Sequence, residues 1–199
     1  GEDFQGNPAA LIQRARETKL DALFDFPLYY AVTDLFCRES SPNNVASNLW
    51  LDRDYPKEFQ HVTFLDNHDL PRLHSICSER DARQALFFQF SIRGIPMLTY
   101  GTEHGLKGKK EPLNRADMPW GVEGNLSEMI TQLVTLRKKN PVLERGVGFV
   151  DKLDENVFIY TQYLDGAAAT VAINRGKTAI AFRRSLSNCF EATDIFQPC

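Results

Sequence analysis

The densest group of chemically useful side chains in this sequence is the run Asp66-Asn67-His68-Asp69, which directly follows the apolar stretch His61 to Leu65. Two carboxylates, an amide and an imidazole in four residues are costly to place beside a hydrophobic core unless each finds a partner. Strand side chains alternate between two faces, so Asp66 and His68 would point one way and Asn67 and Asp69 the other unless the strand ends first.

Three interpretations fit this run of polar residues. It caps a turn; it holds a metal through Asp66, His68 and Asp69 together with His74 or His104; or it performs acid–base chemistry or sugar binding at the end of a strand. Neither His74 nor His104 has a second histidine four positions away, and no motif supplies a third ligand beside them. We therefore assign no metal ligand.

The elements that must position these side chains alternate between strands and helices. The stretch His61 to Leu65 is β-branched and aromatic and predicts a strand, as do Ala22 to Leu28 and Met97 to Tyr100. The spacing of apolar residues predicts helices, which we place at Leu11 to Thr18, Tyr29 to Cys37, Arg80 to Arg93 and Leu126 to Lys139. Buried strands without alternation favour a parallel sheet covered by helices. Functional groups in such folds lie past the carboxyl ends of the strands, where the run 66–69 stands.

The pattern changes after residue 141. Short stretches predict strands around Val157 to Tyr163, at Ala168 to Asn174 and at Thr178 to Phe182, with a turn at Asp165-Gly166. Residues 38–57, earlier in the chain, are rich in Ser, Asn and Pro, and we expect a polar loop there. A β/α part is therefore followed by a small antiparallel β part.

Composition limits the partners of this chain. Its 199 residues include 23 Lys and Arg against 26 Asp and Glu, a formal net charge of −3, which gives no electrostatic reason to expect nucleic acid or an anionic membrane as a partner. No apolar run approaches the ~18 residues of a transmembrane helix. The sequence begins at Gly1 without an initiator methionine, so we expect a processed product or a piece of a longer protein.

The four cysteines indicate little about function or cellular compartment. They form no CxxC motif, which argues against a structural zinc site. We expect Cys37 and Cys77 to be free buried thiols. Cys189 and Cys199 are close enough in sequence to pair in an oxidising compartment.

Residues 62–69, 93–103, 113–120 and 133–143 resemble, in this order along the chain, four motifs of the α-amylase family, glycoside hydrolase family 13. Residues 62–69 (VTFLDNHD) are similar to the seventh-strand motif, in which Asn-His-Asp follows an apolar strand. Residues 93–103 (RGIPMLTYGTE) resemble the eighth-strand motif. Residues 113–120 (LNRADMPW) are similar to the segment after that strand, and residues 133–143 (LVTLRKKNPVL) to the last barrel helix and its exit.

This resemblance implies an α/β fold. Residues 1–143 would be the second half of a (β/α)8 TIM barrel, from strands five and six to strand eight, and residues 144–199 an all-β C-terminal domain, a small antiparallel β-sandwich. Ala22 to Leu28 would be strand six. Gly1 to Phe4 resembles the end of strand five, where Gly-Glu carries the general acid.

The resemblance also implies a function, namely a retaining reaction on α-glucosidic bonds with an α-glucan or maltooligosaccharide as substrate. Glu2 would be the general acid. Asp69 would bind sugar hydroxyls and favour the distorted, cationic transition state. His68 would donate a hydrogen bond to a sugar hydroxyl, and Asn67 would belong to the same substrate-binding group.

One part of the family pattern is missing from these 199 residues. The nucleophilic Asp stands at the end of strand four in the family, and no matching motif occurs here. We therefore expect the isolated chain to be inactive and the half barrel to self-associate. Calcium is common in the family and would be a cofactor of the parent enzyme, but its usual ligands lie mainly outside this segment, so no cofactor is assigned here. A secreted or periplasmic location is slightly favoured for the parent enzyme. The alternative function is a non-catalytic amylase-like protein that binds or interacts, although retention of Glu2, His68 and Asp69 favours an active parent.

Overall fold

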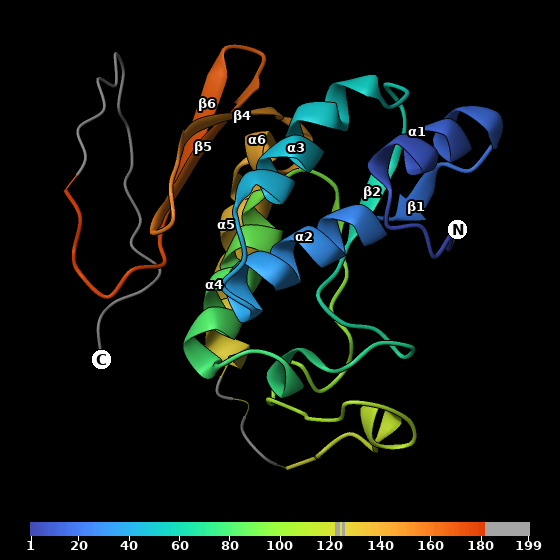
Figure 1. Cartoon of the computed structure of the whole chain (residues 1–199), viewed down its shortest axis with the longest axis vertical. Coiled ribbons are helices and arrows are strands. Elements are labelled where there is room, and N and C mark those ends of the chain that lie inside the picture. Colours follow the sequence, from blue (N-terminus) through green and yellow to red (C-terminus); the bar gives the residue numbers. More distant parts are fainter. Residues whose placement is uncertain (122–123, 125, 182–199) are drawn as a thin grey trace.

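A parallel sheet of three short strands lies at the centre of the first part of the chain. The computed structural model describes residues 1–121, 124 and 126–181 (Figure 1). The strands β1 (Ala22–Phe24), β2 (Gln60–Thr63) and β3 (Ile95–Pro96) pair in the order β1-β2-β3. Phe24 is aligned with Val62, and Val62 with Ile95. The parallel sheet expected from the sequence is therefore present, and all three strands end at the same edge.

None of the three strands has the bounds predicted for it, and the strand expected over His61 to Leu65 ends at Thr63. The strand expected over Ala22 to Leu28 stops at Phe24, because the side chain of Asp25 accepts a hydrogen bond from Leu28 N at 3.0 Å and caps a helix. The strand expected at Met97 to Tyr100 is absent there, and β3 lies directly before it at Ile95–Pro96. Met97 N still donates to Thr63 O at 2.8 Å, so the chain stays beside β2 for one more residue.

The first residue lies against β1 in the manner of a further parallel strand. Gly1 N donates to Ala22 O at 2.8 Å, and Phe24 N donates to Gly1 O at 3.1 Å. This pair of bonds on either side of Leu23 is the pattern of a parallel ladder. Glu2 is thereby placed at the carboxyl edge of the sheet, as the resemblance to the end of strand five implied.

The helices cover the sheet and begin at residues suited to that position. Asn7 caps the first helix by accepting from Ala9 N at 2.9 Å, and Ser78 caps the fourth by accepting from Asp81 N at 3.2 Å. The helices are α1 (Pro8–Glu17), α2 (Phe26–Cys37), α3 (Asn43–Leu51), α4 (Glu79–Ser91), α5 (Ser127–Lys139) and α6 (Pro141–Arg145), and the short 3-10 helices are η1 (Asp52–Asp54), η2 (Leu73–Ser75) and η3 (Leu113–Arg115).

The loop predicted over residues 38–57 is wrong, because α3 and η1 occupy most of it. Val45 and Leu49 stand one helical turn apart and are both buried. That single pair of apolar contacts anchors a helix whose other residues are mostly polar, which is why its composition suggested a loop.

The second part of the described chain is a single antiparallel sheet. It contains β4 (Val147–Leu153), β5 (Val157–Leu164) and β6 (Ala167–Asn174) in sequence order. The predicted turn at Asp165 and Gly166 is confirmed, with φ angles of 48° and 85°. The sequence interpretation missed β4, and the strand expected at Thr178 to Phe182 is absent from residues 178–181, its last residue lying outside the described part. A sandwich needs two packed sheets, and the described residues 144–181 contain one sheet, so the predicted β-sandwich stays a prediction.

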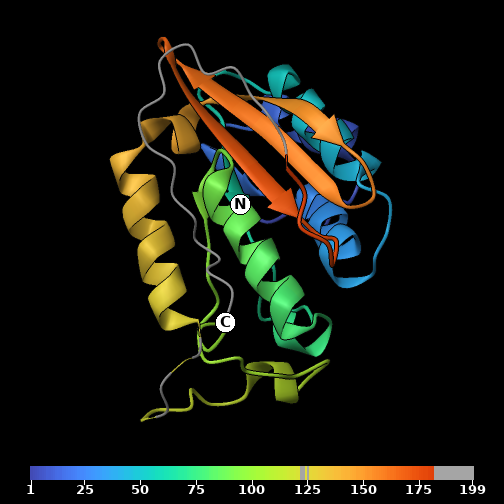
Figure 2. The same cartoon turned by 90° about the vertical axis from the view of Figure 1, so that its left-hand side faces the viewer.

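The two parts share one hydrophobic core. The antiparallel sheet lies beside the helices of the first part (Figure 2). The ring of Phe88 on α4 lies 5.6 Å from that of Phe158 and 5.7 Å from that of Tyr160, both on β5. Tyr160 Oη donates to Ser91 O at 2.6 Å at the end of α4. The antiparallel sheet is therefore fixed against the helical layer, and the predicted boundary between residues 143 and 144 stays a prediction.

A buried guanidinium closes the carboxyl end of α4. Arg137 on α5 donates through Nη1 to Phe90 O at 3.0 Å and Ile92 O at 2.6 Å, and through Nη2 to Gly94 O. Gly94 has a φ of 94°, and a Cβ there would lie 2.5 Å from His61 O. The chain can turn from α4 into β3 here because Gly94 tolerates the positive φ and Arg137 satisfies the free carbonyl groups at the end of the helix.

Cys37 and Cys77 are joined by a disulfide, so the expectation of two free thiols is wrong. The end of α2 and the residue before the cap of α4 lie together, with the two Cα atoms 4.4 Å apart. Cys189 and Cys199 lie outside the described residues. Among the described helices none is both long and apolar enough to cross a membrane.

Candidate active site

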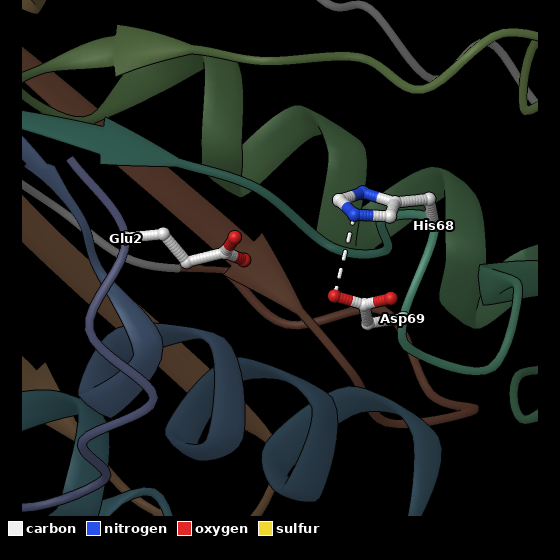
Figure 3. A group of neighbouring side chains, drawn as sticks. All are labelled: Glu2, His68 and Asp69. Carbon is white, nitrogen blue, oxygen red and sulfur yellow. Dashed lines mark ion pairs between the residues drawn. The ribbon is translucent and has the colours of Figure 1, made fainter.

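Three of the predicted site residues converge at the carboxyl edge of the parallel sheet. Glu2 comes from the segment beside β1, and His68 and Asp69 come from the loop after β2 (Figure 3). One ligand atom of each lies within 4.8 Å of those of the other two, and all three side chains are exposed. Glu2, His68 and Asp69 thus form one open polar cluster although Glu2 is far from the other two in sequence, and we call this group the acidic cluster.

Asn67 is buried behind the acidic cluster and contacts two of its members. It is only 2% exposed, its Oδ1 accepts from Asp69 N at 2.9 Å, and its Nδ2 donates to Glu2 Oε1 at 3.5 Å. His68 Nε2 lies 3.3 Å from Asp69 Oδ2. The strand has ended before this point, so His68 and Asp69 share one side of the loop and Asn67 takes the other.

The loop that follows β3 fixes the other side of Asp69. Arg115 Nη2 donates to Asp69 Oδ1 at 2.6 Å, and Arg115 Nε donates to His68 O at 2.9 Å. Asn114 Nδ2 donates to His68 O at 2.9 Å, and Glu111 pairs with Arg115 at 2.7 Å. The sequence interpretation used residues 113–120 only as a family motif and assigned Asn114 and Arg115 no contact with the site. Nothing in the local spacing shows that this distant loop returns to residue 69.

Asp66 does not join the acidic cluster. Its buried carboxylate accepts from Leu73 N at 2.9 Å and from Thr102 Oγ1 at 3.1 Å, and Arg72 Nε lies 3.6 Å from it. These contacts tie the loop after β2 to the loop after β3. The turn interpretation thus holds for Asp66, while the chemical interpretation is retained for His68 and Asp69.

The metal interpretation built on Asp66 and a second histidine is wrong in its ligand set. Nε2 of His74 lies 3.1 Å from Thr102 O, and burial lowers the pKa of this imidazole. The Nε2 atom of His104 lies 3.7 Å from Oε1 of the neighbouring Glu103. Among the described residues, the group with atoms close enough to hold a cation is the acidic cluster itself. Arg115 already supplies a positive charge to Asp69 there, so a cofactor is not assigned.

Parallel strands alternating with helices, with two carboxylates past their carboxyl ends, are the features of a β/α-barrel enzyme site. The family model described as the alpha amylase catalytic domain matches residues 1–133. The chain therefore belongs to the alpha-amylase family.

Individual relatives agree with this assignment. The chain is 34% identical over 171 residues to a cyclomaltodextrin glucanotransferase of Niallia circulans, which covers 83% of this chain and 24% of that protein. It is 31% identical over 183 residues to a beta/alpha-amylase of Paenibacillus polymyxa, which covers 87% of this chain and 15% of that protein. The chain therefore spans about a quarter or less of the length of these relatives.

Solved structures show the same similarity in three dimensions. An Anoxybacillus alpha-amylase superposes with a TM-score of 0.79 at 28% identity, over 88% of this chain and 40% of that one. A three-domain cyclomaltodextrin glucanotransferase superposes with a TM-score of 0.77 at 29% identity, over 88% of this chain and 37% of that one. The similarity to solved amylase-family structures therefore extends over most of the chain.

Proposed function

We propose that this chain is part of a retaining, α-glucan-active glycosidase or glucanotransferase, with its parallel strands as barrel strands six to eight. The observation that carries the proposal is the approach of the Glu2 and Asp69 side chains, from different strand ends, to within 4.8 Å of each other and of His68. Cyclomaltodextrin glucanotransferases and amylases among the relatives support an α-glucan as the substrate.

Glu2 acts as the general acid in this proposal. Its carboxylic acid protonates the glycosidic oxygen as the bond to the anomeric carbon breaks, so that the leaving sugar departs as a neutral alcohol. The nucleophilic carboxylate attacks the same carbon and forms a covalent glycosyl ester. That carboxylate would come from the end of strand four. Glu2, now ionised, then takes a proton from water or from a sugar hydroxyl that attacks the ester.

Asp69 and His68 bind the sugar in which positive charge develops. Arg115 holds Asp69 Oδ1, which leaves Oδ2 directed toward His68 and the open side of the acidic cluster. A fixed negative charge beside the reacting sugar stabilises the oxocarbenium-like transition state more than the neutral ground state. His68 donates to a sugar hydroxyl, and Asn67 keeps Glu2 and Asp69 at their relative positions.

The isolated chain is inactive in this account, because the covalent step has no carboxylate acceptor. Incubation of the purified chain with maltoheptaose should release no shorter sugar. Turnover that survives rigorous purification and that is abolished by Glu2→Gln would contradict this statement and would require a nucleophile within these residues.

The general-acid assignment is tested in the full-length protein with two substrates. Glu2→Gln should lower kcat on maltoheptaose by about 10²–10⁴. The same variant should form the glycosyl-enzyme from α-maltosyl fluoride at a near-normal rate, since fluoride leaves without protonation. Equal losses on both substrates would show that Glu2 is not the acid. An inactive full-length protein that still binds maltoheptaose would favour the non-catalytic alternative.

A further inference from the structure

A second group of exposed aromatic side chains lies far from the acidic cluster. Trp50 on α3 is 62% exposed and Phe149 on β4 is 45% exposed. Together with Leu49 and Val150 they line a groove of about 520 Å³ between α3 and β4, which we call the α3–β4 groove. Tyr163 on β5 extends this surface, with its ring 5.9 Å from that of Phe149. Large apolar side chains gathered at an open groove mark a binding surface.

An exposed cation, Arg53, lies against two of these aromatic rings at the border of the groove. The guanidinium carbon of Arg53 lies 3.5 Å from the centre of the Trp50 ring and 5.8 Å from that of Phe149. Arg53 Nε donates to Trp50 O at 2.8 Å, which sets the direction of the guanidinium plane. In the described part of the chain, the hydrogen bonds of Arg53 use only Nε. Its two Nη groups therefore remain as donors held at the border of two aromatic rings.

The α3–β4 groove and the acidic cluster lie at opposite ends of the parallel strands. Helix α3 continues through η1 toward the amino end of β2, whereas His68 and Asp69 follow the carboxyl end of β2 (Figure 1). A ligand in the α3–β4 groove would therefore leave the acidic cluster open.

We propose that the α3–β4 groove is a non-catalytic binding site for an α-glucan chain. The faces of Trp50 and Phe149 suit the apolar C–H faces of glucose rings, and the Nη groups of Arg53 suit their hydroxyl oxygens. A neutral polyol needs no opposite charge at the site. The choice of an α-glucan rests on the proposed function, since the enzyme would gain by holding its own polymeric substrate at a second point.

The size of the α3–β4 groove favours a sugar over a protein. A volume of about 520 Å³ is within the range of roughly 300–1,000 Å³ found for small-molecule sites. A stable protein partner would cover about 800 Å² on each side, far beyond these few side chains. A second copy of this chain is therefore an outcome for the test to detect and not the expected occupant.

The test uses the chain itself and its own fluorescence. The sequence has two tryptophans, and Trp120, 84% exposed on a different loop, is replaced by Trp120→Phe so that Trp50 alone reports. Titration with maltoheptaose should change the Trp50 emission in a saturable manner, and cellohexaose should not. Phe149→Ala and Arg53→Ala in the same background should each weaken the binding of maltoheptaose by about tenfold or more. Leu113→Ala, an exposed apolar control elsewhere, should leave it unchanged.

Each result decides for or against the α3–β4 groove. Melting curves verify that the variants are folded, and Phe149→Leu replaces Phe149→Ala if the latter is not. Equal responses to both sugars, or binding unaffected by both groove variants, would overturn the proposal. A Trp50 signal that follows protein concentration instead of sugar would assign the groove to a second copy and overturn it as well. Binding of maltoheptaose that is lost in Asp69→Asn but kept in Phe149→Ala would place the glucan at the acidic cluster. That result would overturn the proposed groove site and leave the proposed function unaffected.

Discussion

Arg115 and Asp69 form a direct ion pair across the site, with Arg115 Nη2 2.6 Å from Asp69 Oδ1. The pair joins the loop after β3 to the loop after β2, and Arg115 Nε binds the carbonyl of His68 as well. One guanidinium thus holds both the side chain of Asp69 and the backbone beside it.

Arg115→Ala should therefore misplace Asp69 without unfolding the protein. In the full-length protein we expect kcat on maltoheptaose to fall by about tenfold, a loss that corresponds to the lower end of the range for a charged hydrogen bond. Arg115→Lys should recover only part of it, because Lys cannot bind two acceptors with one planar group. An unchanged kcat with a lowered melting temperature would show that Arg115 is structural only.

A buried ionic network of Asp25, His61, Asp52 and Arg93 should make the stability of the fold depend on pH. Burial alone would raise the pKa of Asp25 from 3.8, but the charge of Arg93 and the contact with His61 outweigh it, and this pKa lies well below its usual range. Arg93 Nη1 donates to Asp25 Oδ2 at 2.9 Å and Arg93 Nε to Asp52 Oδ2 at 2.7 Å. The stabilisation from Asp25 is therefore fully present above the unfolded pKa of about 4 and is lost as the pH falls through the lower folded value.

Arg93→Ala is the direct test of that network. It leaves two carboxylates without their cation and should lower the free energy of unfolding by about 3–5 kcal/mol. Urea titrations at several pH values measure both effects. A variant as stable as the parent chain at pH 7, or a parent chain with no loss of stability below pH 4, would contradict the role given to Asp25 and Arg93.

The disulfide should contribute measurably to stability. It links Cys37 and Cys77, whose sequence separation is 40, so reduction should lower the free energy of unfolding by about 2–5 kcal/mol. Melting with and without dithiothreitol measures the effect, and a variant with Cys37→Ser and Cys77→Ser should be insensitive to the reductant. Equal sensitivity of that variant would place the redox effect elsewhere.

The exposed apolar side chains and unpaired edges of the parallel sheet should drive self-association of the isolated chain. Ile95 is 49% exposed on β3, and Phe4 is 54% exposed beside the opposite edge. Pairing of two copies would cover these side chains and the unpaired strand edges. Sedimentation should show dimers or larger species at micromolar concentration. A stable monomer over that range would contradict the prediction.

Sequence reasoning succeeded where local pattern and fold agree. The sequence predicts a strand over His61 to Leu65, and β2 occupies Gln60–Thr63, because β-branched side chains such as Val62 and Thr63 fit a sheet. Polar residues follow it at the carboxyl edge, as such folds require. The grouping of Glu2 with Asp69 depended on the family resemblance, since 67 residues separate them and no local pattern shows their approach.

The failures come from contacts that no local pattern encodes. Helix α3 is held by two buried side chains, Val45 and Leu49, in an otherwise mostly polar segment. Strand β4 was missed because its large apolar residues Val147 and Phe149 lie on the exposed face, the reverse of the usual pattern. The Cys37–Cys77 bridge depends on how α2 meets the start of α4. The contact of Arg115 with Asp69 likewise depends on the path of a long loop.

The central claim is that Asp69 stabilises positive charge in a transition state, and Asp69→Asn in the full-length protein tests it most directly. The substitution keeps the shape of the side chain and removes its charge. Steady-state kinetics on maltoheptaose should show kcat lowered by about 10²–10³ with KM little changed, and a melting curve should show a fold as stable as the parent protein. A near-normal kcat together with a melting temperature lowered by many degrees would show that Asp69 is a structural cap and would contradict the site proposed for this chain.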